Sequence, residues 1–166
     1  IRISNLNLMN NYKEAFEKTK LAGVIAAGAL DEVAKVAKPG VKTNFIDKLC
    51  NEYINDHGAY SAPLFYRGFP KSCCTSVNHV VCHGIPSEKI LKEGDILNVD
   101  VTALKDGWHG DTSRTFEIGN VSIKAKKLIQ TGEPIIWTIL ENILRTYHTS
   151  KKITDKNFFL AFGEVL

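Results

Sequence analysis

The sequence lacks a long hydrophobic run, a signal peptide and a cluster of like charges. Its most apolar stretch, residues 21–30, is about half as long as a membrane span requires, so we expect no membrane insertion. No segment reads as a signal peptide, and Ile1 as the first residue predicts that the natural N-terminus is missing or processed. The net charge is only +3 and the lysines are spread along the chain, which argues against a nucleic-acid surface.

Cysteine is scarce, and its spacing excludes a zinc cluster. The four cysteines, Cys50, Cys73, Cys74 and Cys82, lack the paired spacing typical of zinc ligands. The adjacent residues Cys73 and Cys74 would point to opposite faces of a strand. We therefore expect free thiols in a reducing compartment and predict a cytoplasmic protein.

The residues that are present predict an α/β (α+β) fold. The 166 residues are 44% apolar and 23% charged, which suits one globular domain or half of a larger one. The first predicted helix, residues 12–37, has an apolar face formed by Leu21, Val24, Ile25, Val33 and Val36. Further helices are expected at residues 44–56 and 123–130. Strands are expected at residues 64–66, 73–81, 95–104 and 107–118.

The last two strands are expected to form a hairpin. Asp106 and Gly107 tolerate the positive backbone angles of a tight turn and are flanked by alternating apolar residues. If they form the loop, Lys105 pairs with Trp108 and Thr102 faces Asp111. A loop one residue longer would turn Asp111 to the opposite face.

In this register Asp100 and Asp111 are diagonal neighbours on one face. Their side-chain roots would lie about 7 Å apart or less, close enough to hold one cation or two adjacent ones. Aspartates near a turn are usually solvated, and we expect Asp106 to be only a turn residue. Asp100 lies in the apolar run 96–101, where an unpaired charge is costly, so a cation partner is the simpler explanation.

The sequence around the hairpin resembles type I methionine aminopeptidases, which remove the initiator methionine from nascent chains. The resemblance rests on residues 76–86, 91–96 and 110–113, and it extends upstream through residues 38–41, 49–54 and 68–72. It covers roughly residues 15–130, in order and without large gaps. It implies the N-terminal half of a "pita-bread" fold, with an antiparallel sheet and covering helices.

The resemblance also implies a site. Asp100 and Asp111 match metal ligands, and His83 matches the catalytic histidine that contacts the substrate near the scissile amide. The methionine side-chain pocket would be lined by Tyr66, Phe69, Cys74 and Cys82. From the residues alone, core packing would be the default for Tyr66 and Phe69, and a structural role the default for His83. The family uses two divalent ions, which the ligand types leave open among cobalt, manganese, iron and zinc.

Three further metal ligands of the family have no counterpart here. They are a histidine in a His-Gly-Ile-Gly setting and two glutamates. After Asp111 the one histidine is His148, and the glutamates there are Glu117, Glu133, Glu141 and Glu164. The family glutamates precede a proline and a histidine; here only Glu133 precedes a proline, Pro134, and it lacks the surrounding family sequence. We therefore expect weak or partial metal binding and no useful peptidase activity from the chain as it stands.

The resemblance ends near Gln130, which divides the chain into residues 1–130 and an unmatched tail, residues 131–166. Apolar residues at helical spacing suggest a helix in the tail, with Pro134 near its start. The tail has three explanations: a frameshift, a mispredicted fragment end or a real shortened variant. The abrupt change of pattern favours the frameshift.

Two functional hypotheses follow. In the first, the chain represents a methionine aminopeptidase whose partners are nascent peptides with an N-terminal methionine, near the ribosome and without nucleic acid or membrane. In the second, it is a non-catalytic half-domain that binds a partner through an apolar surface left uncovered where a second half would pack.

Overall fold

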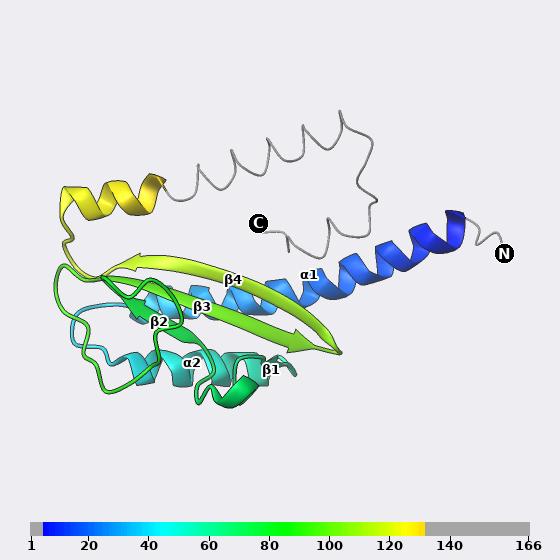
Figure 1. Ribbon diagram of the computed structural model, residues 1–166, viewed down its shortest axis with the longest axis horizontal. Coiled ribbons are helices and arrows are strands. Elements are labelled where there is room, and N and C mark those ends of the chain that lie inside the picture. The colour runs from blue at the N-terminus through cyan, green and yellow to red at the C-terminus, as the bar shows by residue number, and fades with distance from the viewer. Residues whose placement is uncertain (1–4, 132–166) are drawn as a thin grey trace.

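A computed structural model describes residues 5–131 of the chain. Two helices, α1 (Asn5–Val36) and α2 (Thr43–Asp56), cover one face of an antiparallel sheet (Figure 1). The four strands are β1 (Tyr60–Ser61), β2 (Cys74–Val77), β3 (Ile96–Lys105) and β4 (Trp108–Glu117). Residues 123–131 are helical. The predicted α/β class, with an antiparallel sheet and covering helices, is confirmed.

The long strand β3 organises the sheet. β4 pairs along one edge of β3 over its whole length, while β1 and β2 share the other edge. The turn between β3 and β4 has φ of 50° at Asp106 and 84° at Gly107, as a two-residue hairpin loop requires. The predicted register is confirmed, because Thr102 lies opposite Asp111 and Asp100 opposite Ser113.

Alternation along β3 separates the core from a polar face. Leu97, Val99 and Val101 point toward the helices and are fully buried. They pack with residues of α1 and α2, among them Leu30, Val33, Ile46 and Ile54. The intervening residues of β3 point to the other side, and so do their partners on β4. This second face carries Asn98, Asp100, Thr102, Asp111, Ser113 and Thr115.

The face of α1 that packs on the sheet differs from the predicted one. Leu21 and Val24 are 48% and 60% exposed, whereas Ala22, Ala26 and Ala29 are fully buried. The reason is a close approach of backbones: a Cβ on Gly110 of β4 would collide with the backbone of α1 at Ala22 and Gly23. Small residues therefore form this contact. The prediction that Leu21 and Val24 belong to the buried face of the helix was wrong.

The predicted strand at residues 64–66 is also wrong. Residues 62–65 form turns, followed by the 3-10 helix η1 (Tyr66–Gly68), and the strand that joins the sheet is the shorter β1. The left-handed φ of 66° at Phe65 and 47° at Arg67 is incompatible with an extended strand.

β2 is shorter than the predicted strand at residues 73–81. It ends at Val77, and at the next residue, Asn78, φ is 56° and the side-chain oxygen accepts a hydrogen bond from the backbone amide of Ile96 at 3.0 Å. Aspartate and asparagine tolerate this conformation and commonly end regular structure. The predicted helix of the tail lies outside the described residues.

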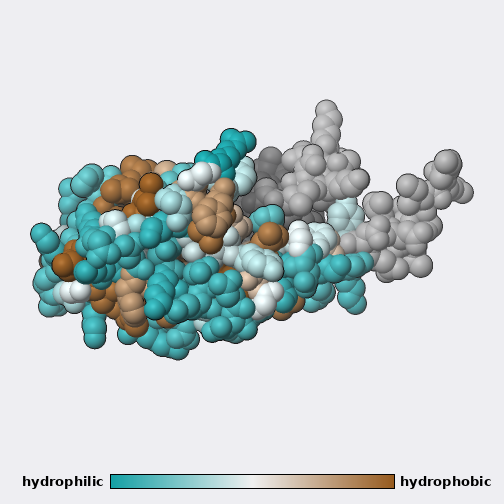
Figure 2. Space-filling model, turned by 90° about the horizontal axis from the view of Figure 1, so that it is seen from below, coloured by the Kyte–Doolittle hydropathy of each residue, from teal (hydrophilic) through white to brown (hydrophobic). Residues whose placement is uncertain are grey.

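The surface seen from the side of α2 is mostly hydrophilic, with hydrophobic residues in separate patches (Figure 2). In the part of the chain that the structure describes, no helix has both the length and the hydrophobicity needed to cross a membrane.

Candidate metal and substrate site

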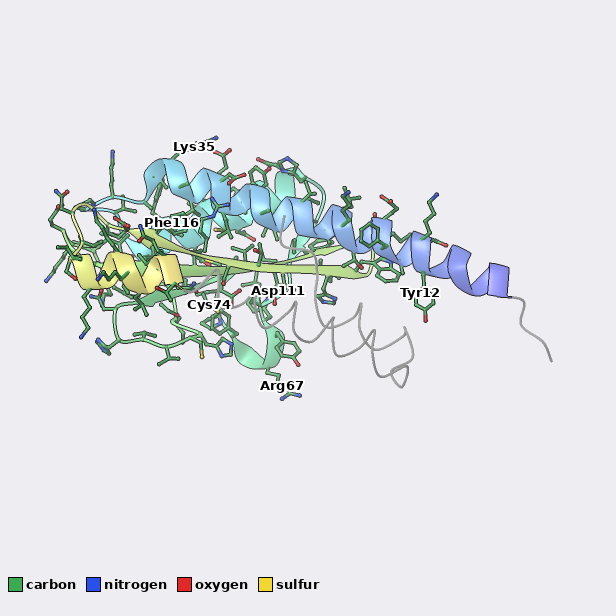
Figure 3. The ribbon with its side chains drawn as sticks, turned by 90° about the horizontal axis from the view of Figure 1, so that it is seen from above. Tyr12, Lys35, Arg67, Cys74, Asp111 and Phe116 are labelled. Atoms are coloured by element: carbon green, nitrogen blue, oxygen red, sulfur yellow. The ribbon has the colours of Figure 1, made fainter. Side chains whose placement is uncertain are left out.

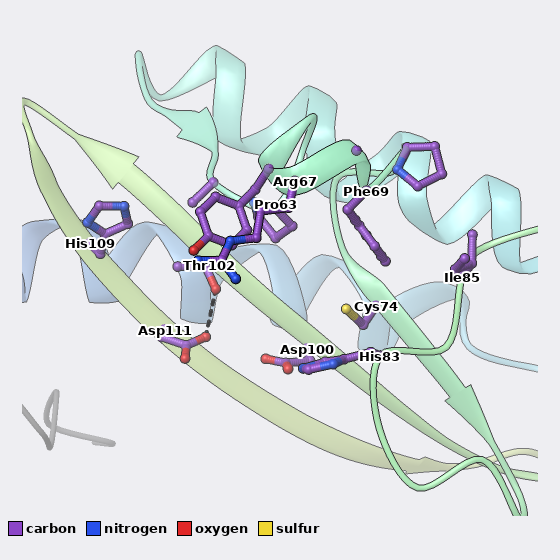
Figure 4. A pocket seen from close by; sticks show the side chains of 14 residues that line it. Pro63, Arg67, Phe69, Cys74, His83, Ile85, Asp100, Thr102, His109 and Asp111 are labelled. Carbon is purple, nitrogen blue, oxygen red and sulfur yellow. Dashed lines mark hydrogen bonds between the residues drawn. The ribbon is translucent and has the colours of Figure 1, made fainter.

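A pocket of about 940 Å³ opens on the face of the sheet that the helices leave uncovered (Figure 4). β2, β3 and β4 contribute Cys74, Asp100, Thr102, His109 and Asp111 to it. The loops before β2 and β3 contribute the rest of the lining: Ala62, Pro63, Tyr66, Arg67, Gly68, Phe69, Pro70, His83 and Ile85. The pocket thus combines carboxylates and imidazoles with an apolar wall.

The two aspartates lie diagonally across the hairpin. Asp111 is exposed, and its carboxylate accepts a hydrogen bond of 2.8 Å from the Thr102 hydroxyl directly opposite (Figure 4). Asp100 is half-buried. Burial, followed by the nearby charge of Asp111, raises the pKa of Asp100, and His83 partly opposes this shift. Two carboxylates so placed repel one another, and a divalent cation between them relieves the repulsion.

The backbone around His83 fixes this side chain beside Asp100 (Figure 4). The carbonyl of Gly84 accepts a hydrogen bond from the amide of Thr75 at 2.7 Å, and the Gly84 amide donates to the Ser76 hydroxyl at 3.2 Å. A Cβ on Gly84 would collide with the Thr75 carbonyl, so the chain passes close along β2 only because this residue is glycine. His83 itself takes a left-handed φ of 53°, a conformation that clusters at functional sites.

The apolar wall contains three of the predicted pocket residues. Tyr66 lines the pocket and is 64% exposed, which excludes core packing for its ring. Phe69 lies beside it on the same loop and is half-buried. Cys74 pairs with Asp100 across β2 and β3. Burial first, and then the charge of Asp100, raises the pKa of the Cys74 thiol to about 11, so this sulfur is neutral at physiological pH.

The other cysteines lie elsewhere. Cys82 is exposed and is not among the residues that line the pocket. Cys73 points into the core, where a hydrogen bond with Cys50 and burial raise the pKa of its thiol. All four thiols are free, and the opposite orientation predicted for Cys73 and Cys74 is confirmed.

Sequence reasoning missed two polar residues of the pocket. His109 lies two residues before Asp111 on β4, so strand alternation alone places both on one face and is the signal that could have found it. Arg67 reaches the pocket from η1, one residue beyond the predicted strand at residues 64–66. No periodic pattern indicates its position.

The donor set for a metal is small in residues 5–131. No three histidine, cysteine or acidic side chains there gather closely enough to hold an ion by themselves. Asp100 and Asp111 supply the carboxylate oxygens that divalent metals accept, with Thr102 orienting one of them. The two residues fit part of a metal centre.

Residues 17–155 of the chain match the model of "Metallopeptidase family M24". The chain belongs to this metallopeptidase family. The match continues past residue 130, near which the resemblance was expected to end.

Within the family, the similar sequences are methionine aminopeptidases. The enzyme of Rickettsia prowazekii is 56% identical over 115 residues, which are 69% of this chain and 44% of that protein. The enzyme of Escherichia coli K12 is 46% identical over 132 residues, 78% of this chain and 50% of that protein. The chain therefore spans about half the length of the curated relatives it matches.

Solved structures of methionine aminopeptidases are similar to this chain as well. A methionine aminopeptidase from Rickettsia prowazekii has a TM-score of 0.70 at 55% identity, covering 71% of this chain and 48% of that one. The enzyme from Thermotoga maritima has a TM-score of 0.69 at 37% identity, covering 70% of this chain and 47% of that one. A prolidase from Pyrococcus furiosus has a TM-score of 0.59 at 22% identity, covering 69% of this chain and 33% of that one, and shows the shared pita-bread fold alone.

Proposed function

We propose that this chain forms one wall of a methionine aminopeptidase site and binds the N-terminal methionine of nascent polypeptides. One observation carries the proposal: the diagonal pair Asp100 and Asp111 lies in one pocket with His83 and an aromatic wall. The similarity to methionine aminopeptidases supports it, although the chain spans about half of their length.

In this proposal Asp100 and Asp111 hold divalent metal, with cobalt, manganese, iron and zinc all compatible with carboxylate ligands. The raised pKa of Asp100 supports a cation partner, because a positive charge nearby would stabilise its ionised form. When bound, such metal polarises the scissile carbonyl and activates water. Thr102 keeps the Asp111 carboxylate oriented through its hydrogen bond.

The remaining residues position the peptide. His83 lies beside Asp100 and donates a hydrogen bond to the peptide near the bond to be cut. Tyr66, Phe69 and the neutral Cys74 thiol surround the methionine side chain, whose thioether packs well against aromatic rings. Cys82 is exposed and would act only at the edge of this pocket.

The alternative of a non-catalytic binding module gains no support from the sheet face around the pocket. That face carries polar side chains, including Asn98, Ser113 and Thr115, and not the apolar ones that this alternative requires there. Two protein carboxylates alone also bind a divalent metal ion only weakly. We therefore propose that the chain binds its substrate class without turning it over usefully.

The peptide Met-Ala-Ser tests this function. Titrated into the isotope-labelled 166-residue chain, it should perturb the NMR amide signals of Tyr66, Cys74 and His83, because these residues surround the bound methionine. Lys-Ala-Ser, which presents a charged side chain to the apolar wall, is the matched control and should perturb them much less. Equal perturbation by both peptides, or none by Met-Ala-Ser, would contradict the proposal.

A further inference from the structure

Arg67 is a cation at the mouth of a pocket whose floor carries two carboxylates. It projects from η1 away from the strands, whereas Asp111 lies at the sheet (Figure 3). We propose that Arg67 is a specificity-determining residue that binds an acidic side chain at the third position of the bound peptide. The inference rests on the proposed function, because the peptide must first enter the pocket by its N-terminal methionine.

The loop that carries Arg67 is held in one shape. The Phe65 amide donates to the Phe69 carbonyl at 2.8 Å, and the Phe69 amide donates to the Tyr66 carbonyl at 2.9 Å. Phe65 and Arg67 are both left-handed, with φ of 66° and 47°. Such conformations cost free energy in residues other than glycine and persist where the surroundings impose them. The loop therefore presents Arg67 from a fixed backbone position.

The guanidinium of Arg67 is available for a ligand. Among residues 5–131, no carboxylate lies within ion-pair distance of it, whereas the Arg114 guanidinium is 2.9 Å from Asp31. Its central carbon lies 5.5 Å from the centre of the Tyr66 ring, a contact with the ring face that does not itself use the N–H groups as carboxylate donors. A guanidinium binds a carboxylate through two parallel hydrogen bonds, which makes an acidic side chain the matching partner.

The third position follows from strand geometry. In an extended peptide, the side chains of the first and third residues point to the same side and lie roughly 7 Å apart. Arg67 and the proposed methionine wall, Tyr66 and Phe69, belong to the same loop and so lie on one side of the pocket. A peptide whose first side chain packs on this wall directs its third side chain toward the same loop.

The charges of the pocket favour this orientation. Asp100 and Asp111 attract cations to the floor, where the peptide amine enters, and they repel an acidic side chain. Arg67 supplies positive charge at the mouth. A peptide with a positive end and a nearby carboxylate therefore matches the pocket along its depth.

The test compares two tripeptide amides that differ by one charge, Met-Ala-Glu amide and Met-Ala-Gln amide. Dissociation constants are measured by NMR titration of the labelled 166-residue chain. We expect the glutamate peptide to bind about two- to fivefold more tightly, the range of an exposed ion pair, and the preference to shrink as salt is added. Arg67→Gln should abolish the preference, and Arg67→Lys should keep part of it.

Lys38→Gln is the control, because Lys38 is an exposed lysine in the turn after α1, outside the pocket. It should leave the preference unchanged. Equal binding of both peptides to the unmodified chain, or a preference that survives Arg67→Gln, would overturn the role of Arg67 and leave the proposed function standing. If neither peptide perturbs the pocket amides, the proposed function fails and the role of Arg67 fails with it.

Discussion

At the residue scale, the chemistry of the pocket depends on which side chains carry charge. The Asp100 carboxyl and the Cys74 thiol face each other across β2 and β3, and both have raised pKa values because both are partly withdrawn from water. The raised pKa has a different consequence for each group. It keeps the Cys74 thiol neutral, which suits an apolar wall, whereas the ionised Asp100 carboxylate is stabilised when a cation lies beside it.

The Cys74 thiol should therefore react slowly. With a pKa of about 11, roughly a thousandth of it is thiolate at pH 8, and the thiolate is the reactive form. We expect iodoacetamide to alkylate the exposed Cys82 at least about tenfold faster than Cys74 at pH 8. The Cys74 rate should keep rising through pH 10, because a raised pKa moves ionisation to higher pH.

Both cysteines lie in the tryptic peptide of residues 72–89, so fragmentation of this peptide in tandem mass spectrometry measures the two rates separately. The Cys82→Ser variant isolates the reaction of Cys74 from that of its neighbour. Alkylation of Cys74 that is as fast as that of Cys82, or that stops rising below pH 9, would show that the thiol is not shielded.

At the element scale, the position of the hairpin depends on its contact with α1. Gly110 of β4 lies against the backbone of α1 at Ala22 and Gly23, and the ion pair between Arg114 and Asp31 joins the same two elements at 2.9 Å. This contact sets the distance between helix and strand. It therefore helps to place Asp111, the residue after Gly110, on the floor of the pocket.

Gly110→Val should be strongly destabilising. Its side chain would collide with helix backbone, which cannot move aside as a flexible side chain would. We expect the free energy of unfolding, measured with urea, to fall by about 1–3 kcal/mol or more.

Gly23→Ala is the matched control at the same contact. A Cβ on Gly23 meets nothing within 4 Å, so this change should leave stability unchanged or raise it by up to about 1 kcal/mol through helix propensity. If Gly110→Val unfolds at the same urea concentration as the unmodified chain, the close approach does not limit the packing of β4.

At the scale of the whole molecule, the proposed function makes the pocket one side of a larger site. The chain spans about half of the methionine aminopeptidases that it resembles, and in residues 5–131 no third histidine, cysteine or acidic side chain gathers with the two carboxylates closely enough to hold an ion. The polar sheet face beside the pocket is consistent with a site whose further metal-binding side chains come from outside residues 5–131.

We expect the 166-residue chain to hydrolyse Met-Ala-Ser, with added manganese or cobalt, at least about a thousandfold more slowly than an intact relative, because metal held by two carboxylates is bound weakly. The Escherichia coli enzyme assayed in parallel is the reference. Turnover at a comparable rate would refute the expectation and would mean that the ligands present suffice.

Much of this fold follows from local sequence patterns. The turn residues Asp106 and Gly107 fix the hairpin register, and strand alternation then places Asp100 and Asp111 on one face. The contact of α1 with the sheet was not predictable in this way. Apolar periodicity selects large residues such as Leu21 and Val24, but a close helix–strand contact selects small ones.

The sequence by itself determined the helices, the hairpin and the pairing of two carboxylates, because each depends on residues close together in the chain. Tertiary structure alone decided that Arg67 of η1 lies at the mouth of the same pocket. It also decided the placement of His83, which depends on Gly84 passing against β2. These placements depend on left-handed residues and on contacts between distant segments, and neither leaves a periodic trace in the sequence.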